Sequence, residues 1–222
     1  VVDIILKLME VPGACDVADF ADGKVRMVGL PLLSDSLMAG KTLADISALY
    51  PNSGILIVAL QKGDRVFIPK GHDVINANDL LFMVMARDKT REALESSGHR
   101  RPPIKRVMIL GGSLIGMELA EDLEKQDIQV KIIEQSEDRC REIAEKCDHA
   151  LVLRGDATYQ DLLIEENAAQ MDTFIAVTED EETNVMISLL AKKMGVRRVI
   201  TLVNKVGYSP LVHSIGVDVV VS

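Results

Sequence analysis

The sequence predicts an α/β protein in which a doubly wound parallel sheet follows a small β-rich α+β domain. From residue 104 onward, short β-branched runs alternate strictly with segments of helical length, which implies βαβ crossovers and a parallel sheet. Before residue 96, short apolar or alternating runs are separated by turn residues. Ser96–Pro103 (SSGHRRPP), rich in Ser, Gly and Pro, separates the two parts and is interpreted as a linker.

The first part predicts a compact domain over residues 22–95. One short helix is expected at Thr42–Leu49, with Thr42 as its cap. Turns are expected at Lys62-Gly63-Asp64 and Pro69-Lys70-Gly71. The expected strands are Lys24–Leu30, Gly54–Leu60, Arg65–Pro69 and Leu80–Ala86. Asp3–Met9 has helical spacing of its own.

The second part, residues 104–222, predicts a sheet that is buried on both faces, because its strands are almost continuously apolar. The expected strands are Arg106–Leu110, Val130–Glu134, Ala150–Arg154, Thr173–Thr178, Val199–Leu202 and Val217–Val221. The helices expected between them are Leu114–Lys125, Asp138–Lys146, Tyr159–Glu166, Glu181–Met194 and Ser209–Ile215.

Composition excludes several classes of protein. The 222 residues carry 25 Lys+Arg and 34 Asp+Glu, and 48% are apolar, which allows sizeable cores and excludes general disorder. The net charge of −9 argues against sequence-independent nucleic-acid binding. Three cysteines without metal-ligand spacing favour a reducing compartment. No apolar run approaches bilayer length and no signal peptide is visible, so we expect a cytoplasmic protein without membrane insertion.

A glycine motif lies at the first strand-to-helix turn of the second part. Its residues, Gly111, Gly112, Ser113, Leu114, Ile115 and Gly116, are similar to the dinucleotide fingerprint G-x-G-x-x-G, with Ser113 at the middle glycine. The first glycine permits the tight turn, the middle one lets a pyrophosphate approach, and the third lets helix and strand pack closely. The domain is therefore predicted to be Rossmann-like, with an anion at the helix N-terminus. The alternative is a glycine turn without a ligand.

Further candidate site residues follow the next strands. Glu134 ends the second strand, where a carboxylate can accept from a ribose 2′-OH and would repel a 2′-phosphate, favouring NAD(H) over NADP(H). Gly155, Asp156 and Ala157 follow the third strand, and Thr178 and Glu179 follow the fourth. Glu181 and Glu182 are better explained as acids at a helix N-terminus.

Other motifs are given structural interpretations. Gly40-Lys41-Thr42 lacks the preceding glycine and parallel sheet of a P-loop. Cys140 and Cys147 would lie about two turns apart on one helix face, too far for a disulfide, and are expected to pack in the core. The four histidines are expected on the surface or in loops, with no nucleophile or metal partner at useful spacing: His72, His99, His149 and His213. A nucleotide site without a catalytic set predicts a sensor rather than an enzyme.

Several segments together resemble the KTN/RCK nucleotide-binding domains that regulate potassium channels and transporters. They are Arg106–Gly116 (RVMILGGSLIG), Gly155–Thr158 (GDAT), Phe174–Asn184 (FIAVTEDEETN) and Ala191–Val196 (AKKMGV). Val25–Ala86 resembles the smaller C-terminal RCK domain, notably in Leu37–Ile46 (LMAGKTLADI). The order of the two resembles the middle of the peripheral subunit of Trk-type bacterial potassium uptake systems.

The resemblance implies a cytoplasmic, non-enzymatic gating-ring component on the inner face of the plasma membrane. It would bind NAD(H), with ATP or ADP as further candidates, beneath a separate membrane potassium pore subunit of Trk type, and would form a homo-oligomer, a tetrameric ring in the full-length protein. Residues 1–21 would be the crossover-helix tail of a preceding nucleotide domain, so that the chain is an excerpt. The family pattern also places Arg139 within reach of a phosphate or adenine. The alternatives are an NAD-dependent oxidoreductase and a scaffold that has lost its nucleotide.

Overall fold

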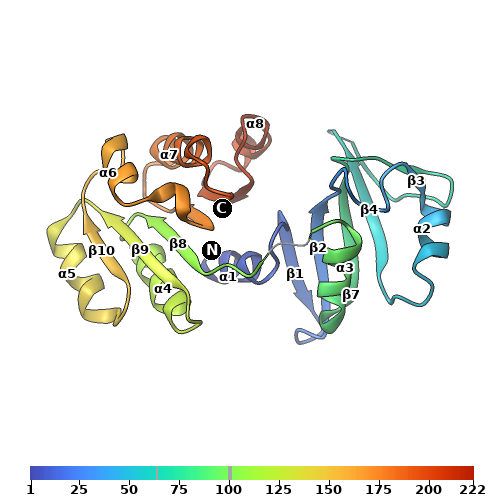
Figure 1. Cartoon of the computed structure of the whole chain (residues 1–222), viewed down its shortest axis with the longest axis horizontal. Coiled ribbons are helices and arrows are strands. Elements are labelled where there is room, and N and C mark those ends of the chain that lie inside the picture. Colours follow the sequence, from blue (N-terminus) through green and yellow to red (C-terminus); the bar gives the residue numbers. More distant parts are fainter. Residues whose placement is uncertain (64, 100–101) are drawn as a thin grey trace. The chain divides into compact units, whose positions relative to one another are not determined.

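The computed structural model describes residues 1–63, 65–99 and 102–222, without the side chains of 206 and 210. Its contacts divide the chain into two compact units (Figure 1). The parallel-sheet unit comprises Val1–Leu6 and Ile104–Ser222, and the antiparallel-sheet unit comprises Lys7–Pro103. Helix α1 (Val2–Glu10) contributes residues to both units. Within the described ranges, no helix combines the length and the apolar character needed to cross a bilayer.

The parallel-sheet unit is doubly wound, as predicted. Its six strands are all parallel and follow the order β10-β9-β8-β11-β12-β13, so the chain reverses direction across the sheet between β8 and β11. The strands are β8 (Arg106–Leu110), β9 (Gln129–Glu134), β10 (Leu151–Arg154), β11 (Thr173–Ala176), β12 (Arg198–Leu202) and β13 (Val219–Val221).

Helices cover both faces of this sheet. Figure 1 shows α4 and α5 on one face and α6, α7 and α8 on the other. Every residue of β11 and β12 is buried, which confirms the double-sided burial expected from their apolar runs. The helices are α4 (Leu114–Glu124), α5 (Glu137–Lys146), α6 (Gln160–Glu165), α7 (Glu181–Met194) and α8 (Ser209–Ser214), with 3₁₀ turns at Ala168–Gln170 and Val206–Tyr208.

The antiparallel-sheet unit is the β-rich α+β part. A five-stranded sheet has the order β1-β2-β7-β4-β5, and a separate two-stranded sheet pairs β3 with β6. Strand β1 lies inside the segment 1–21, ahead of the expected small domain, and pairs with β2. The strands are β1 (Asp16–Phe20), β2 (Val25–Pro31), β3 (Lys41–Thr42), β4 (Leu56–Lys62), β5 (Arg65–Phe67), β6 (Val74–Ile75) and β7 (Leu80–Ala86).

Two helices complete this unit. The cap predicted for α2 (Leu43–Leu49) is confirmed: Thr42 Oγ1 accepts from the Asp45 N–H at 3.1 Å, and Asp45 accepts from the Thr42 N–H at 3.3 Å. Thr42 therefore ends β3 and caps α2, which accounts for Gly40-Lys41-Thr42 without a phosphate. Helix α3 (Thr90–Ser96), which follows the 3₁₀ turn Arg87–Lys89, was not predicted.

Part of the expected linker is packed. Ser96, Ser97 and His99 are buried, and His99 Nε2 lies 2.8 Å from the Pro31 carbonyl oxygen. Residues 100–101 of that linker lie outside the described residues, as does residue 64 of the expected Lys62-Gly63-Asp64 turn.

A buried arginine organises charges at one edge of the antiparallel sheet. Arg26 of β2 is only 3% exposed. Its Nε donates to Asp19 Oδ1 at 2.7 Å and its Nη2 to Glu10 Oε2 at 2.9 Å. Glu10 also accepts from Arg87 at 3.1 Å. These pairs join the end of α1 to β1 and β2.

Candidate functional site

The turn between β8 and α4 is built around Gly111. Gly111 adopts φ +104°, a region that side chains other than glycine rarely adopt, and its N–H donates to the Ile133 carbonyl at 2.9 Å. A Cβ here would lie 2.9 Å from the backbone nitrogen of Thr178. Glycine therefore allows the β8 and β11 ends to approach each other at the point where the strand order reverses.

Glu134 holds the same turn from the end of β9. Its Oε2 accepts from the Gly112 N–H at 2.7 Å, and its Oε1 accepts from the Ser136 N–H at 2.7 Å. A Cβ on Gly112 would lie 2.9 Å from Glu134 Oε2. The carboxylate is thus fixed in the cavity described below, with lone pairs remaining for other donors.

Gly116 and Ser113 shape the start of α4. A Cβ on Gly116 would overlap the carbonyl oxygen of Gly111, so this glycine serves helix–strand packing. Ser113 has φ −61° and caps α4 by accepting from the Gly116 N–H, while its hydroxyl donates to the Val177 carbonyl at 3.1 Å. Position 113 therefore needs no glycine for backbone reasons. The first turn of α4 contains no acidic residue of its own that would offset the positive end of the helix dipole.

The turn after β11 is fixed by Thr178 and Asn184. Strand β11 ends at Ala176, two residues earlier than predicted, and the chain turns into α7. The fully buried Asn184 accepts from the Thr178 N–H at 2.9 Å and donates to the Thr178 carbonyl at 2.9 Å. At the start of α7, Thr183 hydrogen-bonds Asp180 through its hydroxyl and its N–H, and these bonds hold the pKa of Asp180 below its ordinary value.

The turn after β10 is the third turn that carries candidate site residues. Gly155 N–H donates to the Glu134 carbonyl at 2.9 Å, which places this turn beside the end of β9. Asp156 Oδ1 accepts from the Thr158 N–H at 2.9 Å and from its hydroxyl at 2.7 Å. Ala157 is buried.

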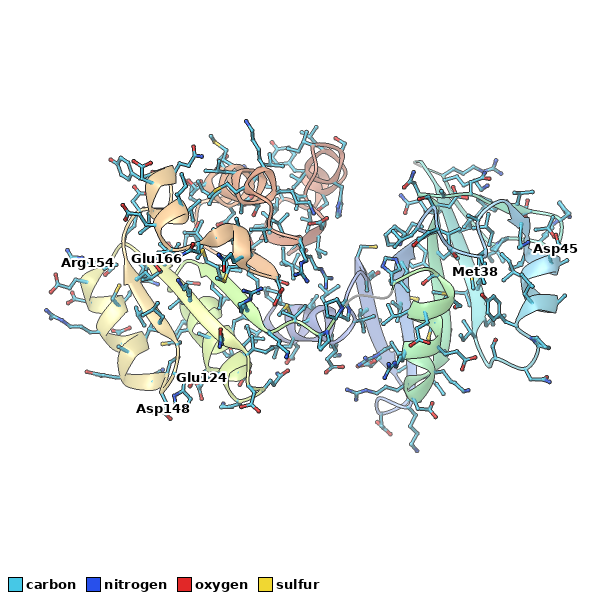
Figure 2. The ribbon with its side chains drawn as sticks, in the orientation of Figure 1. Met38, Asp45, Glu124, Asp148, Arg154 and Glu166 are labelled. Atoms are coloured by element: carbon cyan, nitrogen blue, oxygen red, sulfur yellow. The ribbon has the colours of Figure 1, made fainter. Side chains whose placement is uncertain are left out.

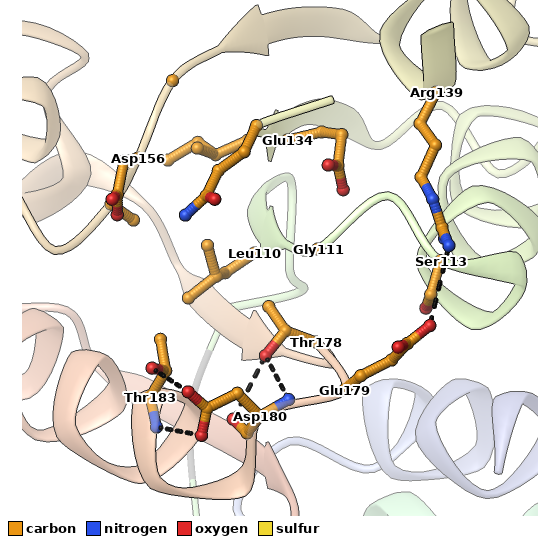
Figure 3. Close-up of a pocket in the computed structure, with 14 residues that line it drawn as sticks. Leu110, Gly111, Ser113, Glu134, Arg139, Asp156, Thr178, Glu179, Asp180 and Thr183 are labelled. Atoms are coloured by element: carbon orange, nitrogen blue, oxygen red, sulfur yellow. Dashed lines mark hydrogen bonds and ion pairs between the residues drawn. The ribbon is translucent and has the colours of Figure 1, made fainter. Parts of the chain in front are cut away.

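These three turns and the end of β9 surround a cavity of about 360 Å³ at the carboxyl edge of the sheet (Figure 3). Ligands of open α/β sheets bind at such switch points. Of the candidate residues, nine line the cavity: Gly111, Ser113, Glu134, Arg139, Gly155, Asp156, Ala157, Thr178 and Glu179. The others, Gly112, Leu114, Ile115 and Gly116, are not among the lining residues, and Leu114 is exposed.

Sequence reasoning missed several residues of this region. Leu110 and Ile133 are predicted only as strand residues, Asp180 only as one of the acids at a helix N-terminus, and Gln135 and Thr183 have no predicted role, yet all five line the cavity. The strand ends could have been included, because the last residue of a parallel strand borders its switch point. Asn184 lies six residues past Thr178 in a helix, and no sequence signal connected the two.

The four histidines are not among the residues that line the cavity. His72, His149 and His213 are exposed, as expected, whereas His99 is a buried loop residue. Across the described part of the chain, no group of His, Cys, Asp or Glu has the arrangement of a metal site.

The expectation for the cysteines needs one correction. Helix α5 ends at Lys146, so Cys147 lies just past it in extended backbone rather than on its face. Cys147 is buried and Cys140 half-buried, and both are free thiols. Burial, with a contribution from nearby Glu124, raises the pKa of Cys147 to about 11.

Comparison with known proteins agrees with this architecture. The TrkA-N domain family matches residues 107–222, and the TrkA-C domain family matches residues 27–98. The Trk system potassium uptake protein TrkA of Halomonas elongata is 37% identical over 222 residues, covering 100% of this chain and 48% of its own length. A TrkA homolog 1 of Methanosarcina mazei is 37% identical over 217 residues, 97% of this chain and 52% of its own length. The chain spans about half the length of these curated relatives.

Solved structures show the same fold. The GsuK RCK domain aligns with a TM-score of 0.64 at 20% identity, over 97% of this chain and 47% of that one. The GsuK channel bound to NAD aligns with a TM-score of 0.64 at 20% identity, over 97% of this chain and 39% of that one. The match to residues 107–222, more than half of the sequence, establishes that the chain belongs to the TrkA-N domain family, with a TrkA-C domain preceding that domain.

Proposed function

We propose that the cavity binds NAD(H), and that the chain is part of a cytoplasmic regulatory subunit of a potassium uptake transporter. The observation that carries the proposal is the meeting of the Glu134 carboxylate and the start of α4 in one cavity at the β8/β11 switch point. The pyrophosphate would lie against Gly111 and Ser113, where the helix N-terminus favours an anion. Glu134 would accept from a ribose hydroxyl, and Asp156 and Ala157 would border the adenosine.

Two observations support NAD(H) as the ligand. One solved structure with the same fold is a GsuK channel bound to NAD. A carboxylate at Glu134 would repel the 2′-phosphate of NADP(H). ATP and ADP present the same adenosine and diphosphate groups and are the next candidates.

The action we propose is binding linkage rather than catalysis. A nucleotide shifts a closed–open equilibrium only through its different affinity for the two conformations. The full-length subunit would form a homo-oligomeric, tetrameric ring on the inner face of the membrane, against a separate Trk-type pore subunit. Several sites in a ring can share the free energy of the shift, each with a modest preference.

Calorimetry of this chain with NADH, NAD⁺, ADP and ATP tests the binding. Glu134→Gln should weaken NADH binding about 10- to 100-fold, since a hydrogen bond to a charged group contributes about 1.5–3 kcal/mol. Glu118→Gln is the matched control, because Glu118 is an exposed acid of α4 outside the cavity lining. Thermal unfolding of each variant without nucleotide shows whether the turn held by Glu134 stays folded.

Two results would contradict the proposal. Absence of adenine-nucleotide binding to a folded chain would remove the site, and steady NADH oxidation with a small carbonyl compound would indicate an oxidoreductase. The transport role is tested separately in cells that depend on Trk uptake. Glu134→Gln in the full-length subunit should there change potassium influx without changing the amount of protein.

A further inference from the structure

We infer that Glu179 competes with the phosphate groups of the nucleotide for the Arg139 guanidinium and so sets the affinity of the site. The inference rests on the proposed function, because it concerns how the same cavity takes its ligand. In the absence of nucleotide, the Glu179 carboxylate would pair with Arg139 where a phosphate would otherwise bind. Glu179 would therefore not contact the ligand as a binding group.

The charge of the cavity lining is the first reason. The fourteen lining residues, all within the described chain, include four acids and one cation, Arg139. The acids are Glu134, Asp156, Glu179 and Asp180. A diphosphate entering this cavity therefore has a single side-chain cation to meet, beside the N-terminus of α4. Whatever holds that guanidinium competes directly with the ligand.

The four acids are not equivalent. Backbone N–H groups donate to three of them: Gly112 and Ser136 to Glu134, Thr158 to Asp156, and Thr183 to Asp180. Glu179 differs, because its carboxylate meets a cation from another element. Its Oε1 lies 3.6 Å from Arg139 Nη2, and the side chain is 86% exposed.

Arg139 is also set apart from the acids on its own helix. Glu137 and Asp138 both pair with Arg141, and Glu137 also pairs with Arg154. Among the described residues, Glu179 is thus the carboxylate paired with Arg139, and Figure 3 shows this ion pair among the residues that line the cavity. Figure 2 shows Arg154 on the same α5 side of the unit.

The contact suits an exchangeable partner. Arg139 is 45% exposed, and an exposed ion pair contributes little because water and salt screen it. A ligand phosphate, with more negative charge than one carboxylate and a favourable helix N-terminus beside it, can displace Glu179. The competition should lower nucleotide affinity by about two- to fivefold, the range of an exposed pair.

A double-mutant cycle on this chain, read by calorimetry with NADH and with ADP, tests the competition. Glu179→Gln should tighten binding about two- to fivefold, and Arg139→Gln should weaken it. In the Arg139→Gln background, Glu179→Gln should leave the affinity unchanged within error. Glu181→Gln removes the same charge from the first turn of α7, outside the cavity lining, and should tighten binding less.

The outcomes distinguish the competition by Glu179 from the proposed binding of nucleotide. If wild type binds NADH and Glu179→Gln binds it no tighter, the competition is overturned and the proposed function stands. The competition is also overturned if Glu179→Gln gives the same gain with and without Arg139, or if Glu181→Gln matches it, because the effect is then general repulsion. If folded wild type and all variants fail to bind either nucleotide, both claims fail.

Discussion

The side-chain amide of Asn184 hydrogen-bonds both backbone groups of Thr178, accepting from its N–H and donating to its carbonyl, each at 2.9 Å. Its Nδ2 also donates to the Leu202 carbonyl at 3.2 Å, so one buried side chain joins the β11 turn to the end of β12. Gly111 and Thr178 both line the cavity and pack on each other, so the position of this part of the lining depends on Asn184, which does not line the cavity.

Replacing Asn184 should therefore cost stability. Asn184→Ala removes the partner of two backbone groups of the half-buried Thr178 and of the buried Leu202 carbonyl, and we expect a loss of about 2–4 kcal/mol in the free energy of unfolding, measured in urea. Asn204→Ala, at an exposed position, should change it by less than about 0.5 kcal/mol. Equal losses in the two variants would contradict the role given to Asn184.

Gly111 and Gly195 offer a matched pair of glycines. Both have positive φ, +104° and +111°, but a Cβ on Gly195 meets nothing within 4 Å, whereas one on Gly111 meets the Thr178 backbone. Gly195→Ala should cost about 1–2 kcal/mol through backbone strain alone. Gly111→Ala should cost clearly more, measured by denaturant unfolding. If the two variants unfold at the same denaturant concentration, the close approach of β8 and β11 does not require glycine at position 111.

Substitutions of Arg26 and Arg91 allow a buried ion pair, Arg26–Asp19, to be compared with an exposed one, Arg91–Glu95. Arg26→Gln leaves the largely buried Asp19 carboxylate with only the longer, 3.7 Å pair to Lys7 and should cost about 3 kcal/mol at neutral pH. Arg91→Gln breaks a pair whose arginine is 89% exposed and should cost almost nothing.

The Arg26 prediction carries a pH signature. The hydrogen bond from Arg26 holds the pKa of Asp19 below its ordinary 3.8. A lowered folded-state pKa contributes stability above the unfolded value, and this contribution is lost as pH falls through the folded value. The difference between wild type and Arg26→Gln should therefore shrink in acid. A difference that stays constant down to pH values below 3.8 would show that packing, not charge, is responsible.

Glu124 supplies a second pH-dependent contact, at the end of α4. Its carboxylate accepts from the N–H groups of Asp148, His149 and Ala150 at 3.0–3.1 Å. Burial opposes the charge, but these three bonds outweigh it and hold the pKa of Glu124 below its ordinary 4.5. Its contribution to stability is therefore present above that value and lost in more acid solution.

Glu124→Gln should lower the melting temperature at pH 7 by about 2–4 °C, the shift expected for a loss near 1 kcal/mol in a chain of this size. The difference from wild type should narrow as the pH falls below 4.5. Glu118→Gln, on the same helix but exposed, controls for the loss of one charge. A pH-independent difference would contradict the hydrogen-bonded role.

The parallel sheet could be predicted from sequence because its signal is repeated: six apolar runs alternate with helical segments, and each supports the others. Thr42 was equally predictable, since its cap involves only Asp45, three residues away. The packing of the segment after α3 was not predicted, because Ser96, Gly98 and the prolines resemble a linker, while Ser96 and His99 are hydrogen-bonded to the distant Ser36 and Pro31.

Some residues of the candidate site could likewise be predicted from local sequence, and others could not. Gly111 and Glu134 could be found because turn and strand end are local features at fixed spacing. The contact between Arg139 and Glu179 joins α5 to the turn after β11, so only the folded sheet brings them together. Asn184 is similar: its hydrogen bonds cross from α7 to β12.

The packing of Gly116 against the Gly111 carbonyl has a consequence for relatives of this chain. Since both glycines are required by the turn itself, a descendant that had stopped binding any nucleotide would be expected to keep them. Loss of the ligand would be expected to appear first at Arg139, whose half-exposed side chain lines the cavity and is not required by the turn. Among such domains, the residue at the position of Arg139 would therefore separate copies that bind a nucleotide from copies that do not better than the glycine motif.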